Sequence, residues 1–180
     1  ATIKLDITNQ KKVYDVFNEF RPDVVINTAA IADVDLCETE KDLCWKTNVT
    51  SINHLAEACK DFGIHLIHIS TDYIFDGKNG PYMERDKANP ISYYGKSKLE
   101  GEKILLTSSI DYTIIRTILV YGNHTKPNIV SFVKKSLESE TSVKLVDDQH
   151  RMPTLVGDLA KACQVVANKK AKGIFHISGN

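Results

Sequence analysis

The stretch "IHLIHIS" at residues 64–70 decides the fold class that we expect for this chain. It is short, and apolar side chains occupy both of its alternating faces. Such strands are typical of a parallel sheet that helices cover on each side. Three more short apolar stretches have the same character, namely 23–27 ("DVVIN"), 112–117 ("YTIIRT") and 173–178 ("GIFHIS"). A parallel sheet is therefore predicted.

Segments with helical spacing of apolar residues separate these strands. Alternation of strand and helix along a chain predicts an α/β fold, and right-handed crossovers give it a doubly wound, Rossmann-like layout. Two further strands are expected at 2–5 ("TIKL") and 142–146 ("SVKLV"). The expected helices cover residues 9–20, 35–61, 93–106, 128–139 and 156–168.

The first turn of a dinucleotide-binding fold has no counterpart in these residues. Such folds open with a strand, a glycine-rich turn and a helix, and none of the nine glycines forms that turn. Either the chain is a fragment that lacks the first βα unit, or the turn is absent from the protein. We expect the fragment, because a sheet without its central strand would expose a broad apolar edge. Residues 1–180 are then a partial NAD(P)-binding domain, in which no residue can be assigned to the pyrophosphate.

Composition favours an ordinary globular chain. Hydrophobic residues make up 42% of the 180, and 23 basic residues balance 23 acidic ones. This balance does not indicate a nucleic-acid surface or a membrane-seeking patch, so we expect a cytoplasmic protein without either partner. The cysteines and histidines follow no metal spacing. We expect free buried thiols rather than a disulfide or a metal site, and packed or hydrogen-bonded histidines at His65, His68 and His176.

The stretch "YYGKSKLEGE" at residues 93–102 places Tyr94 and Lys98 four residues apart on one helix face. A tyrosine hydroxyl has a pKa near ~10 in water, and a neighbouring ammonium favours its phenolate form. The pair therefore suits proton transfer near neutral pH. The alternative is that both side chains only pack and solvate the start of a helix.

Polar and small residues follow two of the predicted strands, at the edge where open parallel sheets bind ligands. Thr71 and Asp72 come directly after the strand at 64–70, where they could hold a reacting group or simply form a turn or a cap. Residues 28–30 ("TAA") follow the strand at 23–27. Their small side chains allow a flat ligand to approach the backbone, although tight helix–sheet packing would also explain them. Asp6 follows the strand at 2–5, where its carboxylate could bind a nucleotide hydroxyl or amino group.

Six separated segments together resemble the extended short-chain dehydrogenase/reductases, and within them the dTDP-4-dehydrorhamnose reductase branch. The resemblance covers essentially the whole chain. It implies an enzyme that uses NADP or NAD to reduce the 4-keto group of a nucleotide-linked deoxysugar. The segments are "INTAAIADVDLCE" (26–38), "HISTDYIFDG" (68–77), "PYMERD" (81–86), "YYGKSKLEGEK" (93–103), "IIRTILVYG" (114–122) and "DDQHRMPT" (147–154).

The resemblance also implies roles for individual residues. The family's catalytic triad matches Thr71, Tyr94 and Lys98. Tyr94 would protonate the sugar oxygen as hydride arrives, while Lys98 would hold the nicotinamide ribose and lower the tyrosine pKa. Thr71 would hydrogen-bond the same oxygen, and Asp72 would contact the substrate.

Cofactor contacts beyond the triad are implied at five positions. Asp6 and Ile7 match the adenine side, and the backbone of Ala29, Ala30 and Ile31 matches the shelf beside the cofactor. Segments around 120–155 match the substrate region. The family often has tryptophan where this chain has leucine at position 119, which leaves the sugar preference open.

Two other functions remain open. The same tyrosine and lysine serve nucleotide-sugar epimerases and dehydratases of this superfamily. A non-catalytic regulatory subunit similar to the methionine adenosyltransferase beta subunit is the second alternative. For the oligomeric state, a homodimer is the assembly that we consider.

Overall fold

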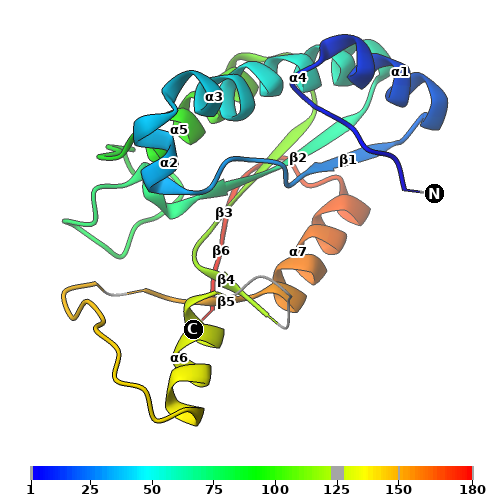
Figure 1. Ribbon diagram of the computed structural model, residues 1–180. Helices are drawn as coiled ribbons and strands as arrows, with labels where there is room; N and C mark the ends of the chain where they lie inside the picture. The colour runs from blue at the N-terminus through cyan, green and yellow to red at the C-terminus, as the bar shows by residue number, and fades with distance from the viewer. Residues whose placement is uncertain (1, 123–127, 150, 180) are drawn as a thin grey trace.

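Four parallel strands form the central sheet of the computed structural model, which describes residues 2–122, 128–149 and 151–179 (Figure 1). Their order is β1-β2-β3-β6. The expected parallel, doubly wound arrangement is therefore confirmed. The strands are β1 (Val24–Asn27), β2 (His65–Thr71), β3 (Tyr112–Thr117) and β6 (Gly173–Ile177).

Helices cover both faces of this sheet (Figure 1). One face carries α1 (Gln10–Phe20), α4 (Ser51–Phe62) and α5 (Tyr93–Thr107), and the other carries α7 (Val156–Lys169). Helix α6 (Ile129–Glu138) lies beside a separate pair of short parallel strands, β4 (Val120–Tyr121) and β5 (Thr154–Leu155). In the part of the chain that the structure describes, no helix is long and apolar enough to cross a membrane.

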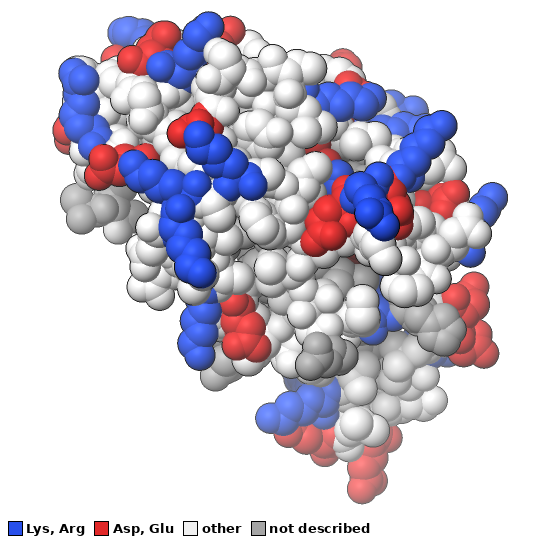
Figure 2. All heavy atoms as spheres, turned by 180° about the vertical axis from the view of Figure 1, so that it is seen from behind, with Lys and Arg blue, Asp and Glu red and all other residues white. Residues whose placement is uncertain are grey.

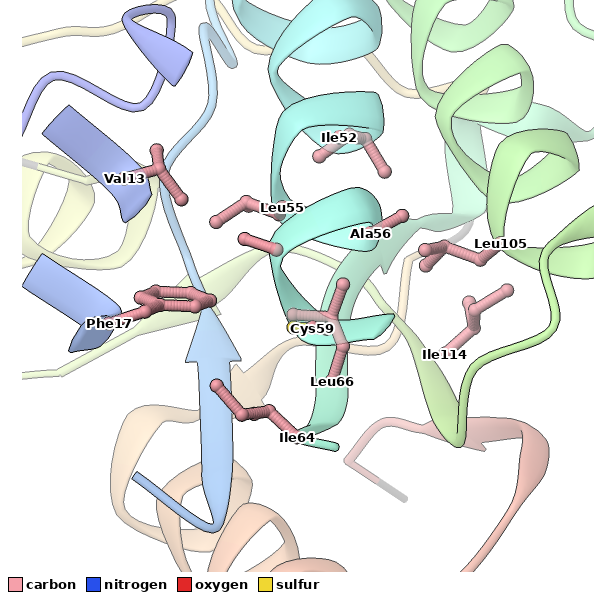
Figure 3. Close-up of a cluster of buried hydrophobic side chains, with 11 residues drawn as sticks. Val13, Phe17, Ile52, Leu55, Ala56, Cys59, Ile64, Leu66, Leu105 and Ile114 are labelled. Carbon is pink, nitrogen blue, oxygen red and sulfur yellow. The ribbon is translucent and has the colours of Figure 1, made fainter. Parts of the chain in front are cut away.

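Alternate residues of β2 and β3 build the two halves of the core. Leu66 and Ile114 belong to one buried cluster with Phe17 of α1 and Leu55 of α4, and Figure 3 shows this cluster. Their sequence neighbours point to the opposite face, where Ile67 and Ile115 meet α7. Apolar residues on both faces of a strand thus produced a core on both faces of the sheet.

The single helix expected over 35–61 is wrong. The chain forms α2 (Val34–Thr39) and α3 (Lys41–Trp45), then a π-helical turn, η1 (Lys46–Thr50), before α4 begins. Glu40 interrupts the helix because its backbone leaves the helical region, with φ −109° and ψ 58°. Cys37 and Cys44, on either side of this break, both lie in one buried cluster with Tyr94, and all four cysteines are free and buried as expected.

The strands expected at 2–5 and 142–146 are also wrong. Neither segment is a strand in the structure, and Leu145 and Val146 are 53% and 68% exposed. A strand is held by hydrogen bonds to a neighbouring strand, and no described strand lies beside either segment to supply them.

Over the surface seen in Figure 2, basic and acidic side chains are interspersed, in keeping with the zero net charge.

Candidate active site

Thr71 and Asp72 lie where β2 passes into a short 3₁₀ turn, η2 (Asp72–Ile74). The Thr71 hydroxyl accepts a hydrogen bond from the Tyr73 N–H at 3.2 Å and contacts Asp72 Oδ1 at 3.2 Å. The hydroxyl therefore does cap the turn, which was the structural explanation for this residue. Burial raises the pKa of Asp72, although Thr71 and the Arg151 charge oppose the shift. The Asp72 carboxyl group, with its raised pKa, thus lies at the edge of the sheet formed by the carboxyl ends of the strands.

Helix α5 is held unusually close to this turn. Ser92 caps its first turn by accepting the Gly95 N–H at 3.1 Å. A side chain at Gly95 would collide with the Tyr73 carbonyl oxygen, and one at Gly101 would lie 2.8 Å from the Asn48 carbonyl oxygen. The two glycines allow α5 to pack directly on η2 and η1. That contact places Tyr94 against the end of β2.

Tyr94 is 8% exposed and lies in a cluster of aromatic and sulfur side chains. Its ring meets that of Tyr73 edge-on, with centroids 5.6 Å apart. Burial raises the pKa of Tyr94 to about 12, and the neighbouring Thr71 side chain opposes that shift. The resemblance implied that Lys98 lowers the pKa of Tyr94, so the shift in this structure has the opposite direction. Tyr94 is therefore a protonated phenol across the neutral range in this structure.

Lys98 shares a helix face with Tyr94, and its amine is turned into the core. The side chain is 2% exposed, and Nζ donates to the Ile69 carbonyl oxygen at 2.8 Å. Nζ also lies 3.2 Å from Nε2 of His68. Burial lowers the pKa of Lys98 to about 8, while Glu102 and Cys44 oppose the shift. Among the described residues, the contacts of this amine are with β2 rather than with the Tyr94 hydroxyl.

The proposed cofactor shelf follows β1 and is pinned by two buried asparagines. Asn27 Oδ1 accepts the Ala29 N–H at 3.1 Å. Asn48, on η1, accepts the Ile31 N–H at 2.9 Å and donates Nδ2 to the Ile31 carbonyl at 3.0 Å. Thr28, Ala29 and Ala30 remain exposed between these anchors. The shelf is thus a fixed, open stretch of backbone.

Asn48 was not predicted from the sequence. It also donates to Ser97 Oγ at 3.0 Å, and Ser97 in turn donates to the Tyr94 carbonyl at 2.7 Å. Asn48 therefore joins the shelf to the helix that carries Tyr94. The available signal was an asparagine four residues from Cys44 and four from Ile52, on an otherwise apolar helix face.

Arg151 reaches the site from the segment "DDQHRMPT". Its Nη2 donates to the Tyr73 hydroxyl at 3.0 Å, and the guanidinium lies 5.5 Å from the centre of that ring. It brings a positive charge beside Asp72. His150 and residues 123–127, which belong to the predicted substrate region, lie outside the described residues.

Asp6 and Ile7 are not joined to this group by any contact in the described ranges. Asp6 is exposed, and its Oδ1 accepts the backbone N–H and hydroxyl of Thr8 at 2.9 and 2.8 Å. The Ile7 carbonyl lies 3.3 Å from His54 Nδ1 on α4. Their predicted role on the adenine side stays a prediction.

The sequence of the chain matches a known family. The family model described as "RmlD substrate binding domain" matches residues 1–180. The chain belongs to this family. It is 38% identical to a dTDP-4-dehydrorhamnose reductase of Aggregatibacter actinomycetemcomitans, over 98% of this chain and 62% of that protein. It is 34% identical to the methionine adenosyltransferase 2 subunit beta of Bos taurus, over 98% of this chain and 55% of that subunit.

A solved structure of a similar reductase shows the same fold. The dTDP-4-dehydrorhamnose reductase of Bacillus anthracis, crystallised in complex with NADP, superposes with a TM-score of 0.93 and 34% identity. The match covers 98% of this chain and 63% of the reductase. The chain therefore spans less than two thirds of the length of these relatives.

Proposed function

We propose that the protein carrying this chain is a reductase that uses NADP or NAD to reduce the 4-keto group of a nucleotide-linked deoxysugar. One observation carries the proposal. A buried, protonated phenol lies beside a threonine hydroxyl at the carboxyl edge of a parallel sheet, in a chain of the RmlD family. The reductases similar to this chain support the same reaction.

The chain's own residues suit protonation of a sugar oxygen. With its pKa raised to about 12, Tyr94 keeps its proton at neutral pH and can donate it as negative charge develops on that oxygen. Thr71, only 6% exposed, would donate a second hydrogen bond to the same oxygen, and Asp72 would contact the sugar. The nicotinamide cofactor, when bound, supplies hydride. Segments around 120–155 would complete the substrate region.

The described residues fit a nicotinamide cofactor on one side. The backbone of Ala29, Ala30 and Ile31 is fixed by Asn27 and Asn48, and the small side chains of Ala29 and Ala30 leave it open to a flat ligand. Lys98 would hold the ribose. Asp6 and Ile7 would lie on the adenine side. We further propose a cytoplasmic protein, with the homodimer as the assembly to test.

The test follows the absorbance of reduced nicotinamide in the full-length protein. A panel of nucleotide-linked 4-keto sugars is supplied with each coenzyme in turn. We expect the absorbance to fall with at least one sugar, and Tyr94→Phe to suppress that fall. A flat trace with every sugar and both coenzymes would overturn the proposal.

A non-catalytic role is the second candidate, because the methionine adenosyltransferase beta subunits are 34% identical to this chain. A regulatory subunit would bind a methionine adenosyltransferase catalytic subunit and change its kinetics. Titration of the purified protein into such an enzyme distinguishes the two functions. A kinetic change there, together with a flat nicotinamide trace, would favour the regulatory role. An epimerase or dehydratase would instead convert the sugar without net loss of reduced nicotinamide.

A further inference from the structure

His68 lies between Lys98 and Asn27, which anchors the cofactor shelf. It is on β2 and is 0% exposed. Its Nδ1 lies 3.1 Å from Asn27 Nδ2, and its Nε2 lies 3.2 Å from Lys98 Nζ. Both ring nitrogens therefore have a polar partner in a fully buried place. A series of hydrogen bonds through Ala29, Asn27, His68 and Lys98 therefore links β1, β2 and α5.

The directions of these hydrogen bonds follow from one fixed donor. The Ala29 backbone N–H can only donate, so it holds the Asn27 amide with Oδ1 toward Ala29 and Nδ2 toward His68. Nδ2 is a donor, so His68 Nδ1 must accept. A neutral imidazole carries one proton, which therefore resides on Nε2 and points at Lys98. The Lys98 amine must accept it, which requires the neutral amine.

Burial makes this assignment accessible. It lowers the pKa of His68 well below its usual value, so the ring is neutral, and it lowers that of Lys98 to about 8, so the neutral amine predominates above that pH and the ammonium below it. The other titratable groups that face Lys98 are Glu102 on the same helix and Cys44 on α3. Glu102 is neutralised by Arg116 of β3, with Nη2 2.7 Å from Oε2.

A protonated Lys98 would require the opposite pattern throughout. An ammonium only donates, so Nε2 would have to accept and the ring proton would move to Nδ1. Nδ1–H would then face the Asn27 amide, which would have to turn its oxygen toward His68. That turn breaks the hydrogen bond to the Ala29 N–H. The protonation of Lys98 and the hydrogen bonding of the shelf are therefore not independent.

We propose that His68 is a positioning residue whose ring tautomer couples the protonation of Lys98 to the backbone shelf at Ala29. The coupling is a property of the fold, and its use in turnover rests on the proposed reductase function. Binding of a cofactor at the shelf would thereby influence the amine that serves the ribose, and the influence is reciprocal.

Nitrogen-15 NMR of the His68 ring in the full-length protein tests the coupling without any activity measurement. We expect the Nε2–H tautomer at alkaline pH and the Nδ1–H tautomer at lower pH, with a midpoint at the Lys98 pKa of about 8. In Lys98→Met the change with pH should disappear. One tautomer at every pH in the wild type would overturn the proposal, and so would a change that persists in Lys98→Met.

Two substitutions of equal polarity test the use of the coupling in turnover. Asparagine at position 68 places its amide where Nδ1 lies, and glutamine places it where Nε2 lies. His68→Asn should keep the contact with Asn27 and lose that with Lys98, whereas His68→Gln should do the reverse. We expect His68→Asn to weaken cofactor binding and turnover about tenfold more than His68→Gln, a difference of about 1.4 kcal/mol.

Urea unfolding of both variants is the control, because both bury one amide and should lose similar stability. If the two variants are equally stable and have equal cofactor affinity and equal turnover, His68 contributes only to packing of the core, and its use in turnover is refuted. An inactive wild type would remove only the proposed reductase function, because the NMR measurement would still decide the coupling.

Discussion

Glu102 is the buried charge on which the position of helix α5 depends, and Glu102→Gln is the most informative stability test. The carboxylate is 0% exposed and accepts Arg116 Nη2 at 2.7 Å and Nε at 3.1 Å, together with the Ser70 hydroxyl at 2.5 Å. These contacts join the helix that carries Tyr94 and Lys98 to β2 and β3. Glutamine has nearly the same shape, so the change removes mainly the negative charge.

The expected cost follows from what remains around Arg116. Removing one partner of a buried ion pair costs about 3–5 kcal/mol, because the other charge stays buried without compensation. Arg116 is 7% exposed and keeps a hydrogen bond from Nη1 to the Glu84 carbonyl at 3.0 Å. That remaining partner places the expected loss at the lower end, about 3 kcal/mol.

Glu100→Gln is the matched control on the same helix. Glu100 pairs with Lys103 at 2.6 Å, but the two side chains are 38% and 54% exposed. An exposed pair contributes at most about 1 kcal/mol. Urea unfolding of both variants at neutral pH measures the difference through the transition midpoints at constant slope. Equal midpoint shifts in the two variants would refute the reasoning, because burial would then not set the cost.

Three further changes test other features of the structure. Tyr94→Phe should lower turnover by about 10²- to 10⁴-fold, and Tyr93→Phe only a few-fold, as measured by nicotinamide absorbance; near-normal Tyr94→Phe activity would contradict the proton-donor role. Lys98→Met should impair both turnover and cofactor binding. In the wild type, the Lys98 pKa of about 8 lies below the ordinary 10.5, so the unfolded state binds more protons between these values. The wild type's unfolding free energy should therefore rise with pH in that window relative to Lys98→Met, and denaturation at several pH values that gives a constant difference would disprove this. Lys170→Gly should stabilise the chain by about 1 kcal/mol, because Lys170 holds a left-handed φ of 43°, whereas Lys169→Gly inside the helix should destabilise it in thermal melts.

The sequence determined the sheet and the helix face of the site through local periodicity. Short strands that are apolar on both faces predicted β1, β2, β3 and β6. The two central strands, β2 and β3, are buried along most of their length, whereas β1 and β6 at the edges are only partly buried. The spacing of Tyr94 and Lys98 placed both on one face of α5, and both are buried there. These properties depend only on residues close together in the chain.

Other predictions failed where structure depends on distant partners. Residues 2–5 and 142–146 have strand-like sequences, but no neighbouring strand in the described chain pairs with them. The break at Glu40 and the π-turn divided the helix expected over 35–61, and two cysteines of this region pack in one cluster with Tyr94, which is distant in sequence. A local pattern cannot report such contacts.

The state of the candidate site was decided by tertiary structure alone. Asn27, His68 and Lys98 come from three elements and meet only when β1, β2 and α5 pack together. Burial of Tyr94 raises its pKa, opposite to the shift that the spacing suggested, and burial of Lys98 lowers the pKa of Lys98. Spacing specifies which side chains share a face. Which of these side chains carry a proton depends on the exclusion of water and on the direction of neighbouring hydrogen bonds. Only the packed structure creates both conditions.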